Sequence, residues 1–151
     1  MSVPESSRTE ARPGTPTHLW IVAVLALLWN LLGAWSYLAA ELELEGYMSQ
    51  HSAEQVAYMT HLPSWVVSVW AIAVWCGVLG SIALLLRKAW ATWLFGLSLI
   101  GLLGNTIYSF LLSNGPEIMG TVGLVLTAII WAISIALLLY ARAQARKGVL
   151  T

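Results

Sequence analysis

The fold is decided by residues 62–112, which read LPSWVVSVWAIAVWCGVLGSIALLLRKAWATWLFGLSLIGLLGNTIYSFLL. The stretch contains two uncharged apolar runs of 25 and 24 residues, Leu62–Leu86 and Ala89–Leu112, separated by Arg87 and Lys88. As a helix, each run would reach roughly 36 Å at about 1.5 Å per residue, enough to cross a hydrocarbon core of about 30 Å. Backbone amides in lipid must be hydrogen bonded within their own segment, so both runs are predicted to be helices. The short link between them predicts an antiparallel pair.

Two further apolar runs, Leu19–Ala40 and Ile118–Ala141, flank this pair and bring the number of predicted spans to four. The sequence therefore predicts an all-α, polytopic membrane protein, a four-helix up-down bundle with a short outer surface helix. The predicted segments are a disordered cytoplasmic tail at 1–16, a transmembrane domain at 17–142 with spans at 19–40, 62–86, 89–112 and 116–141, and a basic cytoplasmic tail at 143–151.

The composition of the 151 residues agrees with a membrane protein, because 59% are hydrophobic and only 9% are charged. Soluble domains are about 25% charged, so a water-soluble globular domain is nearly excluded. The formal net charge is zero, which gives no reason to expect a nucleic-acid partner. Cys76 is the only cysteine, which excludes an intramolecular disulfide and a redox-active cysteine pair.

The charged residues predict the orientation in the membrane. In a four-span topology all lysines and arginines fall on one side, namely Arg8, Arg12, Arg87, Lys88, Arg142, Arg146 and Lys147. The opposite side carries Glu41, Glu43, Glu45, Glu54 and Glu117. Basic loops stay in the cytoplasm, so we expect both termini to be cytoplasmic and residues 41–61 to be outside.

The outer segment 41–61 contains its own helix signal. Ser52 and Gln55 have the spacing of a capping box, and Val56 and Met59 follow at helical spacing. We therefore expect a short helix at 53–61 that lies on the membrane surface.

Each predicted span has one stripe of small and polar residues, for example with Gly77 and Gly80 in the second span and Gly101 and Gly104 in the third. Such stripes suggest either helix packing or a polar site. Membrane helices pack through small residues and form hydrogen bonds between their polar side chains, and this explanation accounts for the stripes without any site. The functional alternative is an outward-facing polar pocket, because several stripe residues fall in the outer halves of their spans. The residues of this candidate pocket are Asn30, Tyr37, Glu41, Trp70, Asn105 and Tyr108.

No residue pattern indicates catalysis, a metal or a cofactor. The sequence has no histidine or aspartate at membrane depth and no nucleophile motif, so we expect no enzyme activity. Haem between helices needs a deep axial ligand, whereas His18, His51 and His61 all lie at predicted helix ends. The histidines, methionines and glutamates of the outer segment match no compact metal motif, so no metal and no cofactor are expected.

Three stretches resemble a group of small four-span bacterial inner-membrane proteins, some of which are labelled sugar transporters or hypothetical proteins. They are SAEQVAYMTHLPSWVVSVWAIAVWCGVLGSIALLLRK at 52–88, SLIGLLGNTIYSFLLSNGPEIMG at 98–120 and YARAQARKGVL at 140–150. The resemblance covers about residues 30–150. It implies a multi-pass protein of the bacterial inner (plasma) membrane, and it implies transport only weakly. No site residue is carried over from the group.

Two functions follow as expectations. The first is a non-enzymatic membrane protein, either an accessory subunit or a small-molecule-binding module. The second is a small-solute, sugar-like transporter, which with only four helices would work as a dimer with its site at the shared interface. The expected partners are the lipid bilayer and either a second copy or another membrane protein. A polar cleft around Tyr37, Glu41 and Asn105 would favour transport, whereas stripes that close on one another would favour the first function.

Overall fold

The computed structural model describes Ala11 and residues 13–151, so most of the predicted tail at 1–16 lies outside the described residues. All regular secondary structure in the described part is helical. The elements are α1 Thr17–Glu41, α2 Glu45–Met48, α3 Ala53–Thr60, α4 Ser64–Leu85, α5 Ala91–Ile107, the π-helical turn η1 Tyr108–Leu112 and α6 Gly115–Arg146. The capping box at Ser52 and Gln55 is present, and it starts α3 where the sequence predicts the surface helix.

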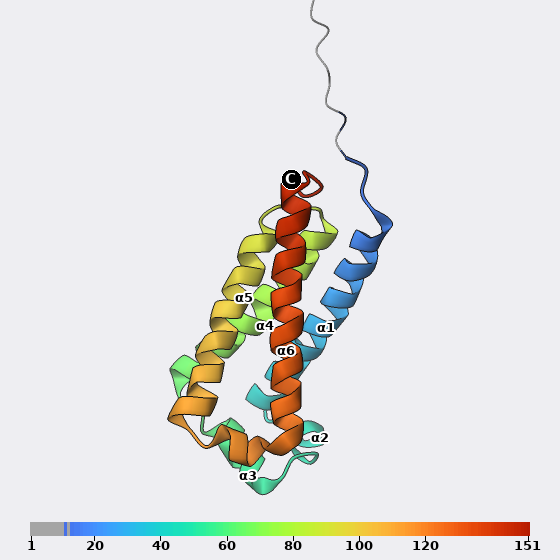
Figure 1. The fold of residues 1–151 in the computed structure, drawn as a ribbon. Helices are drawn as coiled ribbons and strands as arrows, with labels where there is room; N and C mark the ends of the chain where they lie inside the picture. Colours follow the sequence, from blue (N-terminus) through green and yellow to red (C-terminus); the bar gives the residue numbers. More distant parts are fainter. Residues whose placement is uncertain (1–10, 12) are drawn as a thin grey trace, which may run out of the picture.

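Four helices are long and apolar enough to cross a membrane, namely α1, α4, α5 continued by η1, and α6. The chain reverses its direction from each of these helices to the next, and its two described ends lie at the same end of the molecule (Figure 1). That end also carries Arg87 and Lys88, and we call it the basic end. The opposite end carries Glu41, Glu43 and Glu45, and we call it the acidic end.

Helix α4 lies between α1 and α5 and packs against both. Glycine allows the close approach to α5, because a Cβ on Gly101 would lie 2.5 Å from the carbonyl oxygen of Val69 and 2.7 Å from the backbone nitrogen of Ala73. A Cβ on Gly80 would lie 3.0 Å from the Phe95 ring. The small-residue stripes of α4 and α5 therefore face each other, as expected of helices that pack in a membrane.

The most tightly packed part of the structure lies toward the basic end. Its buried residues are Leu19, Ala23, Ala26, Ala83, Leu84, Ala91, Phe95, Leu137, Ala141, Val149 and Leu150. Helix α6 packs mainly on α5 and joins α1 at this end, where His18 Nδ1 and the Tyr140 hydroxyl are 2.6 Å apart. The buried contacts between the helices are therefore concentrated at the basic end.

The segment predicted as the basic cytoplasmic tail at 143–151 is partly helical and folds onto the neighbouring helices. Helix α6 continues to Arg146, and the following residues fold back onto the turn between α4 and α5. Thr151 N–H donates to the Arg87 carbonyl at 2.8 Å, and Ala89 N–H donates to the Thr151 carbonyl at 3.1 Å. Leu150 is only 3% exposed. The physical reason is that burial of the apolar Leu150 side chain is favourable in free energy, whereas its exposure to water is not.

The helices lose regularity at the acidic end. Helix α5 widens into η1, and α6 is interrupted at Gly120, whose φ of 64° and ψ of −169° are not helical. This interruption leaves the Ile118 carbonyl free to accept a hydrogen bond from the Gln55 side chain of α3, at 3.3 Å. The Tyr58 hydroxyl of α3 also lies 3.1 Å from Ser113 Oγ. Helix α3 is thus tied to the turn that joins α5 and α6.

Candidate functional site

Two of the six residues of the predicted pocket meet directly. Tyr37 of α1 and Trp70 of α4 form an edge-to-face aromatic pair, with ring centroids 5.1 Å apart and an interplanar angle of 88°. Both side chains are half-buried in the acidic half of the molecule. Edge-to-face contact is a preferred geometry for aromatic rings, so the pair stabilises the seam between α1 and α4.

Tyr108 belongs to a different aromatic group. Its ring lies edge-on to Trp65 of α4 at 5.8 Å and tilted against Tyr58 of α3 at 6.3 Å. The group lies beneath α3, at the point where α5 becomes the π-helical turn. Tyr108 therefore links α3 to α4 through aromatic contacts.

Asn30 forms hydrogen bonds nearer the middle of α1. Its carboxamide nitrogen donates to the Ala26 carbonyl at 2.8 Å and to Ser81 Oγ of α4 at 3.2 Å. Gly77 faces the carboxamide and has no side chain to displace it, while Ser81 Oγ donates to the Gly77 carbonyl at 2.9 Å. The Asn30 carboxamide therefore acts as a polar link between α1 and α4.

The remaining two residues have no side-chain partner in the described part of the chain. Asn105 is half-buried on α5, and its carboxamide forms no hydrogen bond with a described residue. Glu41 is the last residue of α1 and is exposed. The structure thus brings Tyr37 and Trp70 together and gives Asn30 and Tyr108 partners of their own elsewhere.

Some other polar side chains of the long helices also form hydrogen bonds between helices. Ser98 Oγ of α5 donates to the Ala73 carbonyl of α4 at 2.6 Å. The indole nitrogen of Trp131 in α6 donates to Thr106 Oγ1 of α5 at 3.0 Å, and Thr106 in turn donates to the Leu102 carbonyl at 2.8 Å. These hydrogen bonds hold neighbouring helices together and leave the paired groups with little capacity to bind a solute.

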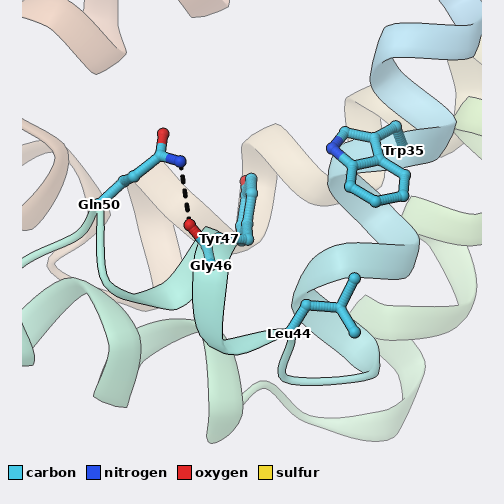
Figure 2. Close-up of a pocket in the computed structure, with 5 residues that line it drawn as sticks. All are labelled: Trp35, Leu44, Gly46, Tyr47 and Gln50. Atoms are coloured by element: carbon cyan, nitrogen blue, oxygen red, sulfur yellow. Dashed lines mark hydrogen bonds between the residues drawn. The ribbon is translucent and has the colours of Figure 1, made fainter.

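A groove of about 310 Å³ lies at the acidic end, and we call it the Trp35 groove. Its lining residues are Trp35, Leu44, Gly46, Tyr47 and Gln50. Figure 2 shows the Trp35 ring on one side and the Tyr47 ring on the other, with the indole nitrogen of Trp35 on the side toward Tyr47. The groove therefore combines two aromatic walls with an available N–H donor.

The end of α1 creates this groove. Leu44 N–H donates to the Ala39 carbonyl at 2.9 Å and Glu43 N–H to the Ala40 carbonyl at 3.1 Å, which is the hydrogen-bond pattern of a Schellman motif. Glu43 takes the left-handed conformation that this motif requires, with φ of 48°. The chain consequently turns back, and Leu44 starts the short helix α2 beside the end of α1.

Local contacts hold the far wall of the groove in place. The Gln50 side chain donates to the Gly46 carbonyl at 2.9 Å. The Tyr47 ring lies 4.7 Å from the ring of His51, whose Nδ1 is 3.0 Å from the Tyr47 carbonyl. Tyr47 is therefore oriented before any ligand arrives.

Exposed glutamates neighbour the lining of the Trp35 groove along the chain. Glu41, Glu43 and Glu45 lie within a few residues of its lining and are all exposed. Within residues 13–151 this end of the molecule carries no lysine or arginine, and no three potential metal ligands come together. Electrostatically, the groove favours a cationic or neutral ligand over an anionic one.

The lining of this groove does not coincide with the six residues of the predicted pocket. The signal that indicates it is Trp35, which lies six residues before the end of α1, at the depth where tryptophan and tyrosine gather in membrane proteins. Tyr47 and Gln50 carry no such signal, because their position depends on the turn after α1.

A second groove, of about 340 Å³, runs along α6 and is almost wholly apolar. Its lining residues are Thr121, Val122, Val125, Leu126 and Ile129. Such a surface within a membrane-spanning helix is suited to lipid acyl chains.

Comparisons of the chain with protein-family models, curated proteins and solved structures gave no match.

Proposed function

We propose that the chain is a four-span protein of the bacterial inner (plasma) membrane, folded as an up-down bundle with both termini in the cytoplasm. The support is the separation of charge between the two ends, with Arg87, Lys88 and Lys147 at one end and the glutamates at the other. Basic segments remain cytoplasmic, which places the Trp35 groove outside.

Labelling with a membrane-impermeant maleimide tests this topology in a Cys76→Ala background. Ser49→Cys, at an exposed position of the acidic end, should label in intact cells. Lys147→Cys, at an exposed position of the basic end, should label only after lysis. The opposite pattern would refute the orientation.

We further propose that the protein works without catalysis, as a small-molecule-binding or accessory module whose binding surface is the outer one. One observation carries this proposal: the Trp35 groove lies at the acidic end, which the proposed topology puts outside, whereas several polar side chains between the long helices form hydrogen bonds with one another or with backbone carbonyls. Asn30 with Ser81, and Thr106 with Trp131, are such pairs. A module of this kind can recognise a molecule at the membrane surface without a polar path through the bundle.

A transport assay separates this function from the alternative of a small-solute, sugar-like transporter. Purified protein in liposomes should take up no more of a panel of labelled sugars and small acids than protein-free liposomes do. Saturable uptake of any member of the panel would contradict the proposal.

The interruption of α6 at Gly120 is the observation that favours an oligomeric transporter, because transporters often build their sites at broken helices. Here, however, the Ile118 carbonyl near the break accepts a hydrogen bond from Gln55, so this group does not need a solute as partner. If uptake is found, chemical cross-linking in the membrane should show a dimer.

A further inference from the structure

We propose that the Trp35 groove binds an outer-leaflet phospholipid whose headgroup carries an ammonium group, as in phosphatidylethanolamine. This inference rests on the proposed topology, which puts the acidic end of the molecule outside. The occupant is identified by the depth of the groove, by the charge around it and by the apolar surface that continues below it.

The depth of the groove matches the boundary between headgroups and acyl chains. Trp35 lies six residues before Glu41, the last residue of α1, and therefore about 9 Å along the helix axis from its end. Interfacial amphipathic helices bury their apolar face about 5–10 Å into this boundary region, and tryptophan is enriched there. The Trp35 side chain is 57% exposed, so it is accessible from the lipid side.

The charge around the groove selects the ammonium group. A cation is attracted to the faces of tryptophan and tyrosine rings, and the structure places Trp35 and Tyr47 on two sides of the same space (Figure 2). Glu41 and Glu45, both exposed, add attraction for a cation and repel a lipid with net negative charge. The indole N–H of Trp35 forms no hydrogen bond with a described residue and is free to donate to a phosphate or ester oxygen of the same lipid.

The apolar surface below the groove fits the acyl chain. Leu32, Leu31 and Leu28 precede Trp35 by three, four and seven residues, so they lie on the same face of α1. Their side chains are 64%, 45% and 56% exposed, respectively. A lipid with its headgroup between the aromatic rings would therefore lay one chain along a continuous apolar strip.

Quenching of tryptophan fluorescence by brominated lipids tests the proposal. Wild-type protein and Trp35→Phe are reconstituted in unbrominated vesicles with a small fraction of either brominated phosphatidylethanolamine or brominated phosphatidylglycerol. The difference between the two proteins reports on Trp35 alone. We expect the ethanolamine lipid to quench this difference signal at about fivefold lower mole fraction than the glycerol lipid, the preference expected for one charge near a charged surface.

Trp20→Phe is the matched control, because Trp20 is 45% exposed on the same helix but lies at the basic end. The Trp20 signal should be quenched by the ethanolamine lipid no more efficiently than by the glycerol lipid. Trp35→Phe should keep the melting temperature of the wild type, since an exposed ring contributes little to packing.

A charge-neutral variant then tests the recognition itself. Replacement of the three exposed glutamates nearest the groove in sequence, Glu41→Gln, Glu43→Gln and Glu45→Gln, should reduce the preference toward one while the melting temperature stays unchanged. Equal quenching of Trp35 by the two lipids in the wild type, or an undiminished preference in the triple variant, would overturn the proposal. The maleimide experiment reports separately on topology, so labelled Ser49→Cys without a lipid preference would refute the lipid site alone.

Discussion

Replacement of Gly101 by alanine tests the central contact of the structure, the approach of α5 to α4. The added Cβ would lie 2.5 Å from the Val69 carbonyl oxygen and 2.7 Å from the Ala73 nitrogen, and both are backbone atoms that no side-chain rotation can move. Restoring the 3.4 Å of an ordinary contact from 2.5 Å requires a shift of about 0.9 Å between the helices. Such a shift also lengthens the hydrogen bond from Ser98 Oγ to the Ala73 carbonyl, now 2.6 Å.

The stability lost through overpacking is partly offset, because alanine has a higher helix propensity than glycine. Overpacking typically costs about 1–3 kcal/mol, whereas alanine is favoured over glycine in a helix by about 1 kcal/mol. We therefore expect Gly101→Ala to lower the free energy of unfolding by up to about 2 kcal/mol, equivalent to a melting temperature lower by as much as about 8 °C. Gly96→Ala is the matched control on the same helix, because a Cβ there meets nothing within 4 Å. This control should be neutral or stabilising by up to about 1 kcal/mol.

The assay can use Cys76, the only cysteine of the chain, which is half-buried on α4. A fluorogenic maleimide reacts with this thiol as the protein unfolds in mild detergent, and the temperature of half-maximal reaction reports stability. If Gly101→Ala melts at the same temperature as Gly96→Ala, the conclusion that α4 and α5 approach closely at Gly101 is wrong.

Three further changes test other contacts with the same thiol assay or by hydrogen exchange. Asn30→Ala should lower stability by about 0.6–2 kcal/mol, because it removes the hydrogen bond to α4. Leu32→Ala is the control at a 64% exposed position and should change stability by less than about 0.5 kcal/mol. Equal effects of the two changes would contradict the Asn30 link. Gln55→Ala removes both the capping box and the hydrogen bond to α6, so amide exchange in α3 should accelerate about fivefold or more. Unchanged protection of these amides would mean that other contacts hold α3 in place. Leu150→Ala should lower stability by about 2 kcal/mol, because the Leu150 side chain is only 3% exposed. Leu86→Ala, at 61% exposure, should be nearly neutral. A neutral Leu150→Ala would mean that Leu150 is not part of the core.

Local features of the sequence predicted much of the architecture. The number of long helices follows from the length of the apolar runs, because a helix that buries its own backbone in lipid needs only consecutive apolar residues. The start of α3 follows from Ser52 and Gln55, since a capping box involves residues only three positions apart. The stripes with Gly77 and Gly101 identify the packing faces, because helical periodicity places these residues on one side of each helix.

The ends of the helices depended on tertiary structure. Helices α1, α4 and α6 all end in the same hydrogen-bond pattern, with Glu43, Arg87 and Gly148 in the left-handed conformation at φ of 48°, 57° and 72°. Glycine signals such a turn in a sequence, whereas glutamate and arginine do not, because their side chains disfavour it. Hydrogen bonds with the C-terminal segment compensate for this local cost at Arg87, because Thr151 N–H donates to the Arg87 carbonyl.

The Trp35 groove shows the same division between sequence and structure. The sequence by itself determined that Trp35 lies near the end of a span, because depth along a helix is counted in residues. Only the tertiary structure decided that Tyr47 and Gln50 stand opposite Trp35, and that Asn30 pairs with Ser81 rather than with the other polar residues of the spans. The physical reason is that secondary structure and membrane depth arise from neighbours along the chain, whereas the partner of a side chain is set by which helix faces come into contact.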